Sequence, residues 1–243
     1  MKEVIVSSLA EPVGILWKEL QEKYTQTKTF TVASPLSGTS IPIYQWIIEH
    51  ASGFPHWKKT QFLLMDEMVE KNNALWSYIP LTDPASYEGF ARNHLIYPLK
   101  EKIGIDIPVI KPYLTKLEEF SIEIDLLILA LGVKGNYANV MPGTTVETGW
   151  HIARLSSEFR QAHTKQGSSS YEGATFREYG MSLGPQQVLK AKHVVVIISG
   201  EKKRDLTREL KDYDACNPAF PLSIIYHPEI EERVTIYITQ DAA

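Results

Sequence analysis

The run IDLLILAL at residues 124–131 is apolar at every position except Asp125. A strand with one face in water alternates apolar and polar residues, whereas a continuous apolar run is typical of a central parallel strand covered on both faces. A second run of this kind, HVVVII, occupies residues 193–198. Both runs favour a sheet that is buried between two layers of helices.

The rest of the chain alternates between strand-like and helix-like segments. Strands are predicted at residues 29–33, 61–65, 122–131, 193–198 and 234–238. Helices are predicted at residues 9–24, 41–50, 87–99, 184–190 and 202–211, the third closing near Pro98. Residues 72–84 are expected to be irregular, and QGSSS at 166–170 is expected to be a loop tip. We therefore predict an α/β, Rossmann-like three-layer fold with a mostly parallel sheet and helices on both faces, in one domain spanning residues 1–243.

Composition limits the partners of the chain. A formal net charge of −4 and an isoelectric point near 6.0 argue against nucleic-acid binding. No run approaches the roughly 18 apolar residues of a membrane span, and the N-terminus lacks a signal peptide. The single cysteine, Cys216, allows no intrachain disulfide. These features predict a cytoplasmic protein that binds a small molecule and neither nucleic acid nor a membrane, with homo-oligomer formation left open.

Four loops follow predicted strands, at residues 35–40, 66–70, 132–143 and 199–203. In open α/β sheets, ligands bind beyond the carboxyl ends of the strands. We therefore expect the four loops to converge on one crevice.

The first and fourth loops carry groups that suit an anion. Ser37, Gly38, Thr39 and Ser40 precede a predicted helix, whose free N–H groups and dipole attract a phosphate. Lys203, at the start of another helix, can meet a phosphate as a point charge. The alternatives are helix capping by the hydroxyl groups and a solvated basic helix start.

The second and third loops carry groups that suit proton transfer. Asp66 and Glu67 directly follow an apolar strand, and a partly desolvated carboxylate can abstract a proton alpha to a carbonyl. The alternative is a pair of solvated loop acids. Gly132 and Gly135 lie beside polar side chains, as in a ligand-lining loop or an ordinary turn. The sequence lacks metal-type histidine spacing, a Walker P-loop and a G-x-G-x-x-G fingerprint, so no cofactor or metal is expected.

Taken in order, these segments resemble the family of glucosamine-6-phosphate deaminases, galactosamine-6-phosphate isomerases and 6-phosphogluconolactonases, with the galactosamine-type isomerases most similar. PLSGTS at 35–40 is similar to the family's phosphate loop, and the MDE that ends at Glu67 is similar to the motif whose aspartate acts at C2. Residues 87–99, 125–132, 180–184, 199–203 and 220–227 resemble further family segments. The resemblance implies that Asp66 is the base and that Lys203 contacts the phosphate. Arg177 and Arg160 are the candidates for the family's phosphate-binding arginine.

The third loop departs from the family pattern G-x-[DN]-G-H followed by N-E-P. Lys134 stands in the Asp/Asn position, Asn136 in the position of the ring-opening histidine, and Met141 in the Glu position. An asparagine side chain cannot act as a general base. The resemblance therefore implies that ring opening lacks its histidine in this chain. Lactone hydrolysis is affected as well, because the lactonases use the same histidine.

The sequence therefore predicts an isomerase or deaminase-like enzyme that acts on a sugar phosphate, an amino-sugar 6-phosphate, through an enediol. Asp66 moves the proton between C2 and C1, residues 37–40 and Lys203 hold the phosphate, and Lys134 polarises the carbonyl. Two alternatives remain. One is a hydrolase similar to 6-phosphogluconolactonase, and the other is a non-catalytic sensor that binds sugar phosphates.

Overall fold

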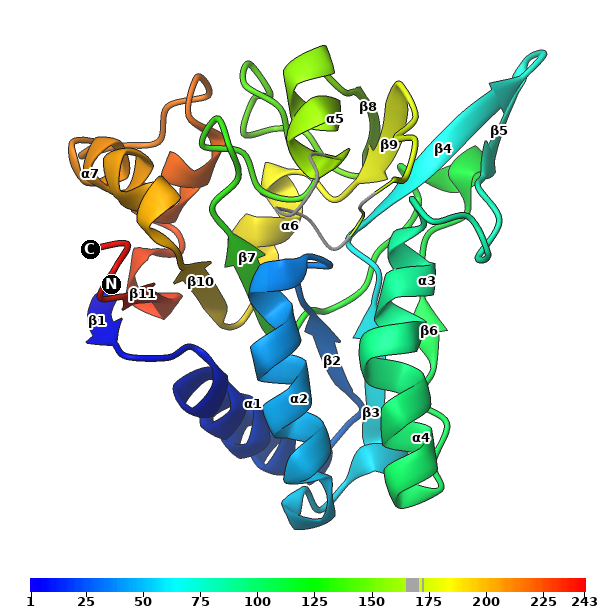
Figure 1. Ribbon diagram of the computed structural model, residues 1–243, viewed down its shortest axis with the longest axis vertical. Helices are drawn as coiled ribbons and strands as arrows, with labels where there is room; N and C mark the ends of the chain where they lie inside the picture. Colours follow the sequence, from blue (N-terminus) through cyan, green and yellow to red (C-terminus); the bar gives the residue numbers. More distant parts are fainter. Residues whose placement is uncertain (165–170, 172) are drawn as a thin grey trace.

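A computed structural model describes residues 1–164, 171 and 173–243 of the chain (Figure 1). The predicted loop tip at 166–170 lies outside these residues. The model contains a seven-stranded sheet in which every neighbouring pair of strands is parallel. Its strands, in spatial order, are β1 (Lys2–Val6), β11 (Val234–Thr239), β10 (Val194–Ile198), β7 (Leu126–Ala130), β2 (Phe30–Ala33), β3 (Thr60–Leu63) and β6 (Val109–Ile110).

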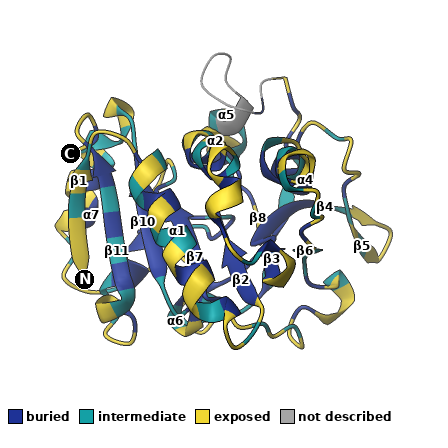
Figure 2. Ribbon diagram, turned by 90° about the horizontal axis from the view of Figure 1, so that it is seen from below, coloured by how far each residue is buried: buried dark blue, intermediate teal, exposed yellow. Residues whose placement is uncertain are grey.

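Helices cover both faces of this sheet, which confirms the predicted three-layer fold (Figure 2). Successive residues of β7 point to opposite faces. Leu126 and Ile128 pack in the core cluster that includes the helices α1 (Ala10–Thr25) and α2 (Ile41–Glu49). Leu127 and Leu129 pack in the other cluster, together with α6 (Pro185–Lys190) and α7 (Arg204–Lys211). The continuous apolar run at 124–131 thus fills two cores at once.

A second, four-stranded antiparallel sheet lies beyond the carboxyl ends of the central strands (Figure 1). Its strands, in spatial order, are β5 (Leu75–Tyr78), β4 (Asp66–Asn72), β9 (Tyr179–Ser182) and β8 (His151–Arg154). This sheet corrects two predictions. Residues 66–70 are a strand and not a loop, because they pair with β9 on one side and β5 on the other, and the segment 72–84 contains β5. The β5, β8 and β9 strands and the edge strands β1 and β6 of the central sheet were not predicted.

The helix predicted at residues 87–99 is longer and less regular than expected. It consists of α3 (Tyr87–Ala91), a π-helical turn (Arg92–Ile96) and α4 (Tyr97–Ile103). Pro98 does not close it, because this proline occupies the first turn of α4, where its missing N–H is not needed. Gly104, with a φ of 69°, ends α4. The remaining helix, α5 (Ser157–Thr164), lies over the carboxyl ends of the parallel strands (Figure 1).

Candidate active site

A cavity of about 310 Å³ lies at the carboxyl ends of β2 and β7, where the two sheets meet. We call it the crevice. Three of the four predicted loops reach it, and the start of β4 supplies the fourth side. The lining residues are Pro35, Leu36, Ser37, Gly38, Thr39, Met65, Asp66, Tyr87, Leu129, Ala130, Leu131, Gly132, Val133, Asn136, Tyr137, Ala138, Ala162, Tyr171 and Lys203.

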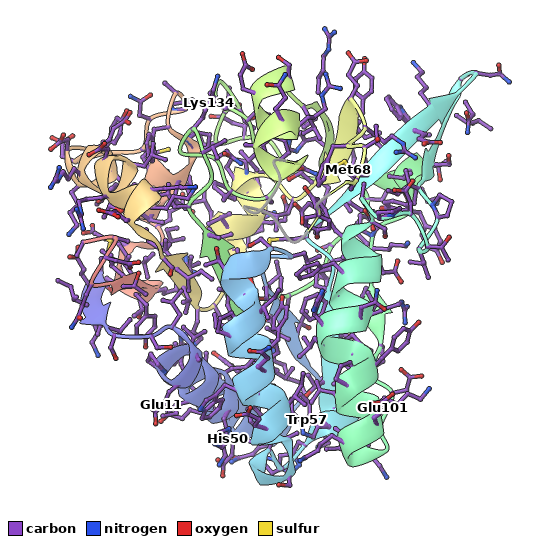
Figure 3. The ribbon with its side chains drawn as sticks, in the orientation of Figure 1. Glu11, His50, Trp57, Met68, Glu101 and Lys134 are labelled. Atoms are coloured by element: carbon purple, nitrogen blue, oxygen red, sulfur yellow. The ribbon has the colours of Figure 1, made fainter. Side chains whose placement is uncertain are left out.

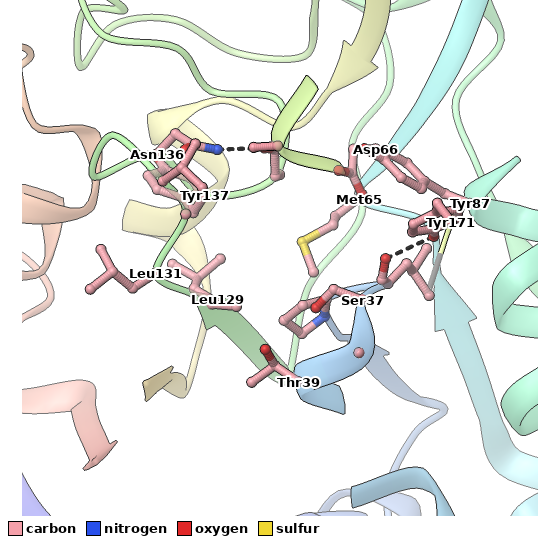
Figure 4. A pocket seen from close by; sticks show the side chains of 18 of the residues that line it. Ser37, Thr39, Met65, Asp66, Tyr87, Leu129, Leu131, Asn136, Tyr137 and Tyr171 are labelled. Atoms are coloured by element: carbon pink, nitrogen blue, oxygen red, sulfur yellow. Dashed lines mark hydrogen bonds between the residues drawn. The ribbon is translucent and has the colours of Figure 1, made fainter. Parts of the chain in front are cut away.

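The first loop presents Ser37, Gly38 and Thr39 to the crevice (Figure 4). Gly38 and Thr39 open a helical run that continues into α2, so their N–H groups have no acceptor within the helix. Ser40, in contrast, is fully buried and does not line the crevice. Its hydroxyl donates a hydrogen bond of 2.5 Å to the carbonyl of Pro35. Ser40 therefore shapes the loop, while its three predecessors face the crevice.

Lys203 enters the crevice from the short helical turn that precedes α7. Burial lowers the pKa of its ammonium group to about 8. Within the described part of the chain, this ammonium makes no hydrogen bond or ion pair. A half-buried cation without a counter-charge is costly, and an anion in the crevice would remove that cost.

Asp66 is the first residue of β4, and its side chain is only 7% exposed. It lines the crevice together with Met65 and Tyr87 (Figure 4). Burial, and then the neighbouring charge of Glu67, raise the pKa of this carboxyl group well above its usual range. A carboxylate with a raised pKa is a stronger base than one in water. The structure therefore has a buried carboxyl group with a raised pKa at the rim where the two sheets join.

Glu67 points away from the crevice and into the protein. Its carboxylate accepts four hydrogen bonds, from the amides of Met68, Tyr87 and Glu88 and from the hydroxyl of Ser86, at 2.7–2.9 Å. Burial raises the pKa of Glu67 to about 6, although these hydrogen bonds act to lower it. Three of the donors belong to the start of α3. Glu67 thus holds α3 against β4, and the structure does not place it in the crevice as a second catalytic acid.

The third loop brings Gly132 and Asn136 to the crevice but not Gly135 or Lys134. Gly135 has a φ of 70°, and a Cβ there would lie 2.5 Å from the ring of Phe220. This turn leaves Lys134 outside, where its ammonium lies 3.9 Å from Glu158, near the upper edge of the molecule in Figure 3. The predicted polarisation of the substrate carbonyl by Lys134 is therefore incompatible with its position.

Asn136 is 3% exposed and faces the crevice. Its side chain makes two long hydrogen bonds within its own loop. The Oδ1 atom accepts from the amide of Lys134, and Nδ2 donates to the carbonyl of Ala138, both at 3.4 Å. A Cβ at Gly132 would lie 2.2 Å from Oδ1 of Asn136, so the glycine allows the side chain to fold over the loop.

Neither candidate arginine lines the crevice. Arg177 forms ion pairs with Glu70 and Asp83, and its third nitrogen donates to the carbonyl of Thr175 at 2.8 Å. These partners hold the guanidinium group away from the crevice. Arg160 lines a neighbouring cavity.

The sequence patterns missed three tyrosines that line the crevice, Tyr87, Tyr137 and Tyr171. The Tyr171 hydroxyl donates to the carbonyl of Leu36 at 2.8 Å and so joins Tyr171 to the first loop (Figure 4). Tyr87 had a signal, because it opens a helix that resembles a family segment. Among the described residues, no three histidine, cysteine or acidic side chains gather as metal ligands would, and no helix could span a membrane.

The fold and the crevice define a Rossmann-like α/β protein with a candidate ligand site beyond the carboxyl ends of its parallel strands. The glucosamine-6-phosphate deaminase of Shouchella clausii is 26% identical over 92% of this chain and 92% of that protein. The enzyme of the same name from Halalkalibacterium halodurans is 29% identical, over 49% of this chain and 46% of its own length. No family model matches the sequence. These similarities confirm the predicted resemblance, because the chain is similar to glucosamine-6-phosphate deaminases over nearly its whole length.

Solved structures share the fold over the whole chain. A monomeric glucosamine-6-phosphate deaminase superposes with a TM-score of 0.78 at 18% identity, covering 100% of this chain and 98% of that one. A 6-phosphogluconolactonase from Thermotoga maritima gives a TM-score of 0.65 at 18% identity, covering 98% of each chain.

Proposed function

We propose that this chain is an enzyme that moves a proton between C2 and C1 of an amino-sugar 6-phosphate through an enediol. One observation carries the proposal. Asp66 and Lys203 are both desolvated, they do not form an ion pair with each other, and both open on the same small cavity. A base and an anion-binding cation in one crevice are the two groups that this chemistry needs.

The crevice fits a ligand of this size and charge. Its volume, about 310 Å³, is at the lower end of the range for ligand pockets. The Lys203 ammonium and the free amides of Gly38 and Thr39 would hold the phosphate. The sugar would then extend toward Asp66 and Asn136, which lie across the crevice from Ser37 and Thr39 (Figure 4).

In the reaction, Asp66 removes the proton from C2 of the open-chain aldose. The electron pair of the C–H bond forms the C1–C2 double bond, and the carbonyl π electrons move to the oxygen on C1. Asp66 then returns the proton to C1, which bonds it with the electron pair of the C1–C2 double bond, while the lone pair of the C2 nitrogen forms a C=N bond. A proton passes from that nitrogen to the oxygen on C1, so the product is a 2-imino sugar with a hydroxyl group on C1. The raised pKa of Asp66 favours the first step, because a more basic carboxylate takes the proton more readily.

The test is to replace Asp66 by Asn and to follow exchange of the C2 proton in D₂O by NMR. Asp66→Asn keeps the shape of the side chain and removes the base. Exchange should fall by about 10²–10⁴-fold, while binding of the sugar phosphate survives. The control is Asp106→Asn, which changes an exposed carboxylate. Wild-type exchange rates in Asp66→Asn would show that another group is the base.

A second candidate is a sensor that binds sugar phosphates without turning them over. It is favoured by Asn136, an amide in the position where the family has its ring-opening histidine, and by the outward position of Lys134. Tight phosphate-dependent binding, with no proton exchange in the wild-type protein even for an open-chain substrate, would select this candidate.

A further inference from the structure

The proposed reaction needs a hydrogen-bond donor for the oxygen on C1. When Asp66 removes the C2 proton, the carbonyl π electrons move to that oxygen, and negative charge grows on it. A donor that meets this oxygen lowers the barrier, because it binds the enolate more strongly than the aldehyde. Lys134, the donor predicted from the sequence, lies outside the crevice beside Glu158. Another group of the crevice has to fill this role.

The three tyrosines of the crevice differ in what their hydroxyl groups do. The Tyr171 hydroxyl already donates to the carbonyl of Leu36. The Tyr137 hydroxyl is fully buried, with no partner among the described residues, so it does not open on the crevice. The Tyr87 hydroxyl makes no hydrogen bond within the described part of the chain and, unlike that of Tyr137, retains accessible surface. Of the three, Tyr87 is therefore the one with a donor to offer to a ligand.

Tyr87 is held beside Asp66. Its backbone N–H donates to Glu67, the residue after Asp66 in β4, at 2.9 Å. Its ring packs against the rings of Tyr171 and Phe176, with centroids 5.5 and 6.0 Å apart. The side chains of Tyr87 and Asp66 lie next to each other at the edge of the crevice (Figure 4). This proximity suits a base for C2 and a donor for the oxygen on C1, because the two carbons are bonded to each other.

The surroundings of Tyr87 keep its hydroxyl protonated. Burial raises the pKa of this hydroxyl well above its ordinary value, and the negative charges of Asp66 and Glu67 act in the same direction. The phenol is therefore a neutral donor that keeps its proton throughout the step. Asp66 gains the proton from C2, and the negative charge that Asp66 loses appears on the oxygen on C1.

We propose that Tyr87 is a catalytic residue whose hydroxyl donates a hydrogen bond to the oxygen on C1 and stabilises the enolate that Asp66 generates. The inference rests on the proposed function, because that function places C1 and C2 beside Asp66. The hydrogen bond strengthens as the oxygen on C1 becomes negative. Tyr87 thus contributes to the rate of the reaction and little to the affinity for the substrate.

The experiment compares the wild type with Tyr87→Phe, which removes the hydroxyl and keeps the ring. Exchange of the C2 proton of glucosamine 6-phosphate in D₂O should slow by about 10²-fold or more. Two ligands that cannot react separate the enolate from the ground state. The hydroxamate of 5-phosphoarabinonic acid resembles the enolate, because a planar O–N–C–O unit replaces C1 and C2, and its affinity should fall by about 10- to 100-fold. The reduced sugar 2-amino-2-deoxyglucitol 6-phosphate has no carbonyl, and its affinity should change by about threefold at most.

Two further variants locate the effect. Tyr97→Phe makes the same change at an exposed position on α4 and should alter none of these values. In an Asp66→Asn background, Tyr87→Phe should still weaken binding of the hydroxamate. A loss that disappears in this background would overturn the proposal, because Tyr87 would then act through the base and not on the ligand.

The outcomes distinguish this inference from the proposed function. Equal effects of Tyr87→Phe on the affinities for the hydroxamate and the reduced sugar would overturn the inference, since the hydroxyl would not recognise the enolate. Wild-type exchange that Tyr87→Phe leaves unchanged would remove this inference alone. If the wild type neither binds these phosphates nor exchanges the C2 proton, the proposed function fails and this inference fails with it.

Discussion

The Glu67 carboxylate accepts the backbone N–H of Tyr87 at 2.9 Å, and this bond joins the strand that carries Asp66 to the helix whose first side chain lines the crevice. The same carboxylate accepts three further hydrogen bonds, from the N–H groups of Met68 and Glu88 and from the hydroxyl of Ser86. Two sides of the crevice are therefore held at a fixed separation by a residue that does not enter it.

Replacing Glu67 by Gln should destabilise the fold. An amide offers one acceptor oxygen in place of two, and its NH₂ group would face backbone donors, so buried N–H groups would lose their partners. Each unsatisfied buried group costs about 1–3 kcal/mol, and we expect a loss of about 2–4 kcal/mol in urea denaturation. The exposed Glu119→Gln is the control and should stay within about 0.5 kcal/mol of wild type. A loss no larger than that of the control would show that the four hydrogen bonds contribute little.

Replacing Lys203 by Met should stabilise the empty protein and abolish phosphate binding. The pKa of Lys203 is lowered to about 8 in the folded chain from an ordinary 10.5, so below pH 8 the fold bears the cost of a buried charge. The melting temperature of Lys203→Met should exceed that of wild type by about 3 °C or more at pH 7. Between pH 8 and 10.5 the unfolded chain binds more protons, so wild-type stability rises with pH and the difference should shrink. The exposed Lys202→Met should show neither effect.

Sugar-phosphate affinity should fall as the pH rises above about 8. Only protonated Lys203 attracts the phosphate, and half of the free protein has lost that proton at its pKa of about 8. The dissociation constant should rise by only about twofold from pH 7 to 8 and then rise toward tenfold per pH unit. The same titrations of Lys203→Met are the control, because any pH dependence of the affinity that persists in this variant comes from other groups. A wild-type profile that stays flat to pH 10 would remove Lys203 from the anion site.

Alanine substitutions at two glycines separate backbone strain from a steric clash. Gly135 and Gly104 have nearly the same positive φ, 70° and 69°. A Cβ at Gly104 would meet nothing within 4 Å, whereas a Cβ at Gly135 would lie 2.5 Å from the Phe220 ring. Gly104→Ala should cost about 1 kcal/mol. Gly135→Ala should cost at least twice as much and weaken ligand binding, because it displaces the loop that carries Asn136. Equal losses would mean that Phe220 moves aside freely.

Five of the seven strands of the central sheet could be predicted from sequence, and β7 and β10 stand out because they are continuous apolar runs. The antiparallel sheet could not. β4 begins with two acidic residues, which are rare in strands, and only the donors of α3, some twenty residues away, make a buried Glu67 tolerable. The short β9 shows no clear alternation.

The sequence predicted best those site residues that lie directly after a strand or at the start of a helix. Asp66, Lys203 and residues 37–39 all reach the crevice, as their places after strands required. The direction of a side chain in a loop was not predictable. Lys134 turns outward because Gly135 takes a positive φ, and Arg177 is held by Glu70 and Asp83, which are distant in sequence.

Asp66 belongs to the antiparallel sheet, whereas Gly38, Thr39 and Lys203 extend from elements of the parallel one. The span between the proposed phosphate anchor and the base is therefore a distance between two sheets. It depends on how they pack, through buried contacts such as those of Val69 and Met181 with the core cluster around Leu127. Changes in side-chain volume at that junction would alter this span. They would thereby change the length of the sugar phosphate that can reach both the anchor and the base, although no residue in contact with the ligand has changed.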